Sequence, residues 1–292
     1  MSEEKYPTTK DAKFWYTLPL ICVITFLLIF AGQLLGDIIK NIVHLPDDPA
    51  TTTFAMYAYF IGIWIVFFIV VLARKRNRFI LERLGTKPAG NTIAWFLLFL
   101  IVGIGLNGLC FLAARLNKDV AVVFDRFEIL PVLAILFAVL IQSGAEEIMC
   151  RGYFYEKIRE TYKSPWVAII SNAVFFAMLH CLNPGVTLLS ILNLILTGFL
   201  FSFIVYYFDS LWGAMALHTG WNYCQSIILG LPNSGIVVPY SIFKLDTASA
   251  RNSFAYNVDF GIEGTIVACV VLAIACVVLY VLGRKRQQKI AV

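Results

Sequence analysis

Long apolar stretches recur along the whole chain, each bounded by short polar segments. A helix of about 20 apolar residues is long enough to cross the hydrocarbon core of a bilayer. The composition agrees, because only 14% of the residues are charged, whereas soluble domains have about 25%. The sequence therefore predicts an all-α, polytopic bundle of about eight transmembrane spans. These spans are 15–36, 54–73, 93–114, 129–150, 166–182, 187–208, 211–229 and 264–283.

Two other compositional features exclude function classes. The net charge of +5 does not indicate nucleic acid as a partner, because the basic residues are concentrated in particular loops. The seven cysteines lie mostly in apolar stretches and form no CxxC motif, which argues against a disulfide framework or a Cys-rich metal site. No cleavage-site pattern precedes the first span, so we expect that span to be retained.

Lysine and arginine gather in alternate loops. Cytoplasmic loops carry an excess of these residues. Placing the N-terminus in the cytoplasm puts most of the 23 basic residues on that side, in segments 1–13, 74–87, 151–163 and 284–289. We therefore predict a multi-pass protein of the cell membrane with both termini cytoplasmic. The basic run at 74–78 is interpreted as a determinant of topology and not as a lipid-binding patch.

Two adjacent carboxylates, Glu146 and Glu147, interrupt the fourth span. Ionisable groups inside a membrane helix are costly and commonly mark functional sites. Glu147 and Arg151 are one helical turn apart and can pair, whereas Glu146 is rotated by about 100° and stays free of that pair. A free carboxylate in apolar surroundings is a candidate general base. The structural alternative is a helix end that reaches the membrane interface.

Two further polar pairs occur at the same one-turn spacing. Phe176 and His180 end the fifth span, which we expect to stop at 183–185, and His218 and Asn222 lie in the seventh. Each pair alone is more often a packing or interhelical hydrogen-bonding feature than a catalytic one. The chain has three histidines, and two of them lie in these apolar spans. The third, His44, falls in a predicted outer loop and receives no role.

The turn between the fourth and fifth spans brings the first two motifs to one height. Pro165 requires a break there, because the residue before a proline resists the helical conformation. Glu146 and His180 lie at equal distances in sequence on either side of Lys163. His218 follows Ser210 by about 12 Å of helix. We therefore expect these residues to meet in the cytoplasmic half of the bilayer, with Glu146 and His180 within one water of each other.

The ordered set EExxxR, FxxxH and HxxxN, on separate spans of such a protein, resembles the CaaX-protease and bacteriocin-processing family (CPBP, also called Abi). That family includes the eukaryotic endoprotease that trims prenylated CaaX tails. The resemblance covers residues 129–229. It leaves 1–128, with the first three spans, and 230–292, with an outer loop and the last span, without family signal.

The resemblance implies an intramembrane endopeptidase. Carried over by motif, Glu146 activates a water with help from His180, while His218 and Asn222 stabilise the oxyanion. Glu147, Arg151 and Phe176 would support the site structurally. The family has also been described as metalloproteases, and a zinc ion would then use Glu146, His180 and His218. We favour metal-free chemistry without a cofactor, because pairing Glu147 with Arg151 removes one ligand and no HExxH motif is present.

Two alternatives remain open from the sequence. A non-catalytic membrane scaffold, such as an immunity or regulatory protein, could keep the fold. A transporter could use Glu146 and His180 as a proton relay, although no inverted repeat with broken helices is evident. For a protease, we expect membrane lipids and a hydrophobic, prenylated or leader-type peptide as partners, with the active site opening to the cytoplasmic side.

Overall fold

Each of the eight apolar stretches is helical over most of its length in residues 17–290, the part of the chain that this computed structural model describes. Six of the resulting segments are long and apolar enough to cross a membrane. The predicted all-α class is therefore confirmed. The fifth and seventh stretches form helices of only 15 and 12 residues, so the count of eight spans stays a prediction.

The helices follow one another along the chain with short connections, and two of them are extended by π-helical turns. Their bounds are α1 (Leu18–Ile42), α2 (Pro49–Ala58), α3 (Ile61–Ala73), η3 (Lys75–Arg83), α4 (Ile93–Leu116), α5 (Ile129–Glu147), η4 (Ile148–Phe154), α6 (Tyr155–Thr161), α7 (Pro165–Leu179), α8 (Leu188–Phe208), α9 (Leu211–Asn222), η5 (Tyr223–Ile228), η6 (Ile262–Gly264) and α10 (Ile266–Ile290). Strands β1 (Val122–Phe124) and β2 (Phe243–Leu245) pair antiparallel.

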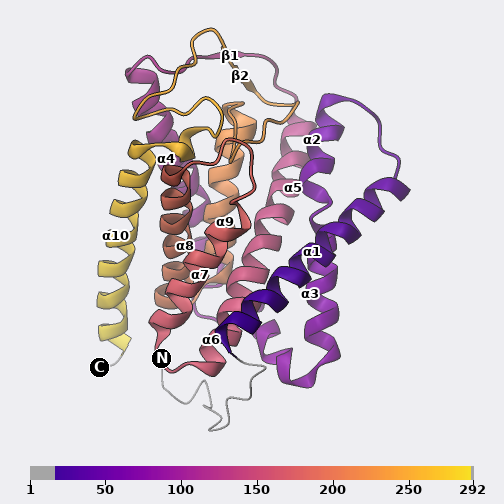
Figure 1. Cartoon of the computed structure of the whole chain (residues 1–292), viewed down its shortest axis with the longest axis vertical. Coiled ribbons are helices and arrows are strands. Elements are labelled where there is room, and N and C mark those ends of the chain that lie inside the picture. The colour runs from indigo at the N-terminus through magenta and orange to yellow at the C-terminus, as the bar shows by residue number, and fades with distance from the viewer. Residues whose placement is uncertain (1–16, 291–292) are drawn as a thin grey trace.

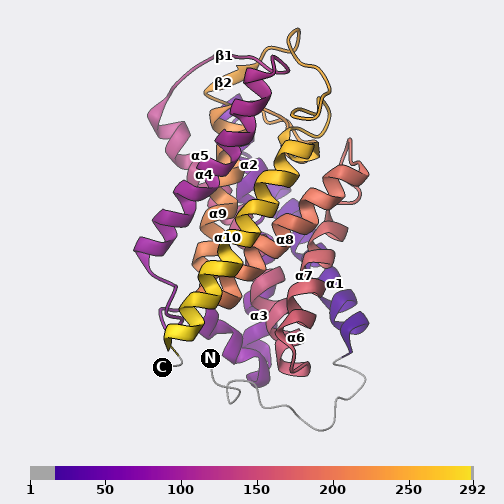
Figure 2. The same cartoon turned by 90° about the vertical axis from the view of Figure 1, so that its left-hand side faces the viewer.

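The predicted inner and outer loops lie at opposite ends of the bundle. The end of α10 and the region of α6 lie at one end, whereas β1, β2 and the loop before α10 cover the other (Figures 1 and 2). At the first end, Arg83 connects η3 to two other segments. It forms ion pairs with Glu156 of α6 at 2.8 Å and with Asp209, which follows α8, at 2.7 Å. Lys5, Lys10 and Lys13, which also entered the topology prediction, lie outside the described residues. The membrane side of each end stays a prediction.

Helix α9 lies in the centre of the bundle, where it packs against α4, α5 and α8. All of its residues except Trp212 are buried. The approach to α4 depends on two glycines: a Cβ on Gly103 would lie 2.2 Å from the carbonyl oxygen of Leu217, and one on Gly220 would lie 2.2 Å from that of Leu100. Small residues at such crossings let helix backbones approach closely. This packing fixes the helix that carries His218 and Asn222.

Helix α5 continues through the π-helical turn η4 into α6 without a break. A π-turn leaves backbone groups out of the regular i to i−4 pattern, and here the carbonyl oxygen of Cys150 accepts a hydrogen bond from the side chain of Asn172 on α7. Helix α7 ends at Leu179, earlier than the expected stop at 183–185. His180 therefore lies in the turn after the helix and not within it.

Candidate active site

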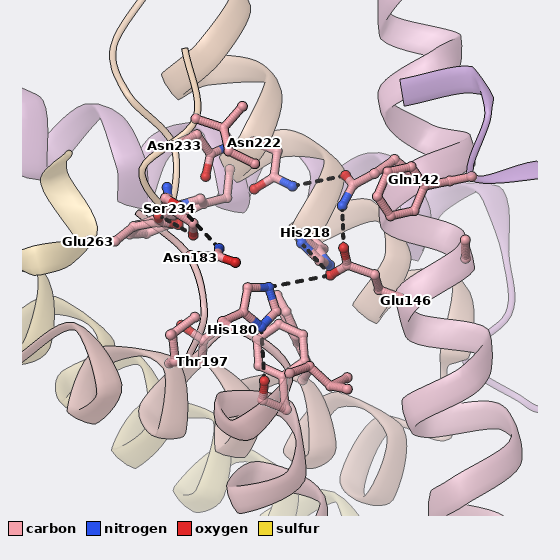
Figure 3. A pocket seen from close by; sticks show the side chains of 18 of the residues that line it. Gln142, Glu146, His180, Asn183, Thr197, His218, Asn222, Asn233, Ser234 and Glu263 are labelled. Atoms are coloured by element: carbon pink, nitrogen blue, oxygen red, sulfur yellow. Dashed lines mark hydrogen bonds and ion pairs between the residues drawn. The ribbon is translucent and has the colours of Figure 1, made fainter. Parts of the chain in front are cut away.

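A cavity of about 310 Å³ lies inside the bundle, between α1, α2, α5, α7, α8 and α9 (Figure 3). This volume is at the small end of the range typical of ligand pockets. The four residues that the sequence predicted to be catalytic, Glu146, His180, His218 and Asn222, all line it. They come from α5, from the turn after α7 and from α9, so the tertiary fold brings together residues that are far apart in the sequence.

The two histidines converge on one oxygen of Glu146. Nε2 of His180 and Nε2 of His218 each lie 3.9 Å from Oε2 of Glu146. This oxygen is inaccessible to solvent and has no hydrogen-bond partner within residues 17–290. A separation of 3.9 Å is too long for a direct hydrogen bond but is readily bridged by one water molecule. The distance agrees with the expectation that Glu146 and His180 come within one water of each other.

Hydrogen bonds at the far side of each ring define which nitrogen carries the proton. Nδ1 of His180 lies 2.9 Å from the carbonyl oxygen of Phe176, and Nδ1 of His218 lies 3.0 Å from Oε1 of Glu147. Both partners are acceptors, so each Nδ1 must donate. In the neutral rings both Nε2 atoms therefore present lone pairs to Glu146. Three acceptors facing one point need a donor between them, which a water molecule supplies.

Glu147 and Arg151 form the buried ion pair that the sequence predicted. Nη1 of Arg151 lies 2.9 Å from Oε1 of Glu147, and both side chains are fully buried. The guanidinium lies over the ring of Phe176 at 4.5 Å and that of Phe201 at 5.0 Å. Glu147 also holds His218, a contact that the sequence analysis missed because it joins two distant helices. Phe176 thus supports the site by covering Arg151 and by accepting from His180.

A protein-family model described as type II CAAX prenyl endopeptidase Rce1-like matches residues 128–224. We call residues 128–224 the Rce1-like segment. The Rce1-like segment begins one residue before α5 and contains all three motifs, which confirms the resemblance seen in the sequence. The match supports the assignment of this segment to a CAAX-type intramembrane endopeptidase. The chain matches no curated protein sequence.

Gln142 is a residue of the Rce1-like segment that sequence reasoning missed. Its Nε2 donates to Oε1 of Glu146 at 2.6 Å, and its Oε1 accepts from Nδ2 of Asn222 at 3.1 Å. Gln142 therefore joins two of the predicted site residues and occupies the oxygen of Glu146 that does not face the histidines. The available signal was its position one turn before Glu146, on the same face of an apolar helix.

Residues outside the Rce1-like segment also line the cavity. The predicted outer loop, 230–263, contributes several side chains, and α1 and α2 contribute others, although these regions carried no family signal. Glu263 is the buried carboxylate among them, and burial raises its pKa above that of an ordinary glutamate. No pattern in the sequence distinguished this residue, since its contacts depend on how the loop folds back.

The residues nominated for zinc in the Rce1-like segment do not fit that ion as they are placed. Neighbouring ligands at 2.0–2.1 Å around tetrahedral zinc are about 3.4 Å apart, whereas Oε2 of Glu146 is 3.9 Å from Nε2 of each histidine. Within the described part of the chain, no group of three or more His, Cys, Asp or Glu side chains has the arrangement of a metal site. The spacing suits a water better.

The basic segments 74–87, 151–163 and 284–289 lie at the end of the bundle that holds α6 and the end of α10, here called the basic end (Figure 1). The cavity extends away from this end. Its lining includes residues of the outer loop but none from segments 74–87 or 151–163. Phe26 and Phe30 of α1 line it and are 51% and 50% exposed, so its wall there is also part of the outer surface of the bundle. The opening toward the cytoplasm that the sequence suggested stays a prediction.

Proposed function

We propose that the chain is an intramembrane endopeptidase that hydrolyses a peptide bond with a water activated by Glu146. The observation that carries this proposal is the convergence of His180 and His218 on the unpaired oxygen of Glu146, within a cavity of the Rce1-like segment. A water held there would donate one hydrogen to Glu146 and the other to a histidine, leaving a lone pair for attack.

Glu146 is the general base in this mechanism. As the water oxygen bonds to the carbonyl carbon of the substrate, its proton passes to Oε2 of Glu146. The same proton then moves to the leaving nitrogen, and the C–N bond breaks to release an amine and a carboxylic acid. Gln142 keeps the other carboxylate oxygen occupied, so the base presents a single, oriented oxygen. Positioned proton transfer of this kind contributes about 10²–10⁴-fold to rate.

His218 and Asn222 are proposed to stabilise the oxyanion of the tetrahedral intermediate. To donate from Nε2, His218 must first take up a proton from solvent, and its Nδ1 then donates to the Glu147 carboxylate 3.0 Å away. In that state the attacking water donates its two hydrogens to Glu146 and His180. Asn222 would turn its amide from Gln142 toward the substrate oxygen. Preorganised donors aimed at a developing charge in a water-poor site are the largest single contribution in many enzymes.

The proposed substrate is a hydrophobic, lipidated or leader-type peptide that reaches the cavity from within the membrane. The half-exposed Phe26 and Phe30 at the cavity wall support lateral entry, since an apolar chain dissolved in lipid meets an apolar surface there. The Rce1-like match supports a prenylated peptide in particular. We propose that cleavage occurs in the cytoplasmic half of the cell membrane. The basic loops assign the start of α9 to the cytoplasmic side, and His218 follows Ser210 by about 12 Å of helix.

Purified protein in liposomes is expected to cleave a farnesylated peptide with a CaaX-type end faster than the same peptide without the lipid. Because the proposed water is held by Glu146 and two histidines, activity should be unchanged after chelator treatment and should not correlate with bound zinc. Mass spectrometry of the products gives the cleaved bond, and elemental analysis of the same sample gives the metal content. Stoichiometric zinc that is lost together with activity would contradict the metal-free mechanism.

Substitution Asn222→Leu is expected to lower kcat by about 10²–10³-fold, which is typical for removal of one oxyanion donor. KM should change little, because the amide would act mainly on the charged intermediate. Steady-state kinetics with the farnesylated peptide separates the two constants. A rise in KM with an unchanged kcat would instead indicate that Asn222 binds the substrate in its ground state.

A further inference from the structure

Glu263 joins the outer loop to the helix that carries His218 and Asn222. Its Oε1 accepts a hydrogen bond from Nε1 of Trp221 at 3.0 Å, and its Oε2 accepts from the backbone nitrogen and Oγ of Ser234, both at 2.7 Å. The side chain lines the cavity but has no part in the chemistry proposed above. Three donors on two elements therefore depend on one buried carboxylate.

The contacts continue from Ser234 to the turn that holds His180. Nδ2 of Asn183 donates to the carbonyl oxygen of Ser234 at 3.1 Å, and the backbone nitrogen of Asn183 donates to the carbonyl oxygen of His180 at 3.1 Å. The loop also packs directly on this turn: a Cβ on Gly235, which has φ +83°, would lie 2.1 Å from the carbonyl oxygen of Pro184. Figure 3 shows Glu263, Ser234, Asn183 and His180 in this order around the cavity.

His180 needs such support because it lies beyond the end of α7. Its backbone nitrogen still donates to Ala177, but the residues that follow form a surface turn in which Leu182 is 96% exposed. Exposed turns with few buried contacts open easily unless something ties them down. The distance from His180 to Glu146 therefore depends on whatever holds this turn.

We propose that Glu263 is a positioning residue that fixes His180 relative to His218. It acts on His180 through Ser234 and Asn183, and on α9 through Trp221. We call the contacts of Glu263 with Trp221 and Ser234, and of Ser234 with Asn183, the Glu263 clamp. The catalytic effect of this clamp rests on the proposed function, whereas its effect on the position of the turn can be measured separately. The clamp also assigns a role to the outer loop, which closes one wall of the cavity and holds the turn beside it.

Deuterium labelling of the backbone amides provides a direct readout of the turn. The backbone nitrogen of Asn183 donates to the carbonyl oxygen of His180, and that of His180 donates to Ala177, so both amides exchange only when the turn opens. In the full-length protein in detergent, the labelling rate of a peptide that contains residues 180–183, measured by mass spectrometry, reports how often the turn opens. Glu263→Gln is expected to raise the labelling rate by about tenfold, since one amide oxygen cannot replace two carboxylate oxygens facing separate donors.

The cleavage assay should change in parallel. We expect Glu263→Gln to lower kcat by about tenfold with KM within about twofold, because the turn and not the substrate is displaced. In Glu263→Gln, a glutamine whose oxygen accepts from Ser234 would point its NH2 group at the indole N–H of Trp221, which is also a donor. Adding Trp221→Phe removes that N–H, so the glutamine oxygen can again accept from Ser234. The double variant should therefore label more slowly than Glu263→Gln alone, which a general loss of stability would not produce.

Asp119→Asn is the matched control. Asp119 is another buried carboxylate that ties down the outer loop, through Arg251 at 2.9 Å, but it does not line the cavity. Its substitution should leave the labelling of the turn unchanged. If Glu263→Gln does not fold, Ser234→Ala, which removes one of the three donors, is expected to raise labelling by about threefold.

The outcomes separate the two claims. The role of Glu263 in holding the turn is overturned if the turn of Glu263→Gln labels at the wild-type rate. It is also overturned if Asp119→Asn raises the labelling rate by the same factor. Both results hold whatever the cleavage assay shows. Failure of the wild-type protein to cleave any peptide contradicts the proposed function, while the labelling rates still decide whether Glu263 holds the turn.

Discussion

Replacing Glu146 by Gln is expected to reduce kcat for peptide cleavage by about 10²–10⁴-fold, the contribution of a positioned general base. The amide keeps the size of the side chain and can still contact Gln142, so the fold should survive. It cannot take a proton from the water that would lie between it and the two histidines, 3.9 Å away on either side. Single-turnover cleavage of a labelled peptide in liposomes measures the chemical step directly.

Lys75→Ala is the control for this substitution, because Lys75 is exposed at the basic end of the bundle and lies outside the cavity lining. It should cleave at the wild-type rate. The same pair of variants tests the scaffold alternative in cells. A phenotype that survives Glu146→Gln would show that the chain supports that phenotype without proteolysis.

Replacing Arg151 by Met is expected to destabilise the protein by about 3–5 kcal/mol, the cost of leaving one charge of a buried ion pair without its partner. Arg151 and Glu147 are both fully buried, so water cannot compensate for the loss. The substitution also removes the contacts of the guanidinium with the rings of Phe176 and Phe201. Thermal unfolding in detergent, followed by helical circular dichroism, measures the shift.

Two further variants separate charge burial from packing in this prediction. Glu147→Gln combined with Arg151→Met removes both charges and should recover much of the stability, because neutral pairs of similar volume are tolerated. The Gln side chain can still accept from Nδ1 of His218. Arg76→Met breaks the pair with Glu160, in which the Arg76 side chain is 45% exposed, and should cost less than about 1 kcal/mol. Equal losses in Arg76→Met and Arg151→Met would refute the role assigned to burial.

Much of the site was predictable because its motifs repeat at the spacing of one helical turn. Glu147 with Arg151 and His218 with Asn222 follow that rule within one helix. His180 lies one residue beyond α7, but its ring still bonds to the carbonyl oxygen of Phe176. The same periodicity gives the spans their lengths. The boundary at His180 was less predictable, since α7 stops before the asparagine and proline that would ordinarily mark its end.

The sequence by itself determined the class of the fold, the position of its apolar stretches and the residues that interrupt them. These properties are local, because bilayer thickness sets the length of a span and helical geometry sets which side chains share a face.

Only the tertiary structure decided which of those faces meet. Three contacts join elements far apart in the chain. His218 of α9 hydrogen-bonds to Glu147 of α5, Asn222 of α9 donates to Gln142 of α5, and Trp221 of α9 donates to Glu263 of the outer loop. Such contacts depend on how closely helices pack and on where a loop returns, and neither quantity is encoded in the spacing of residues along one segment.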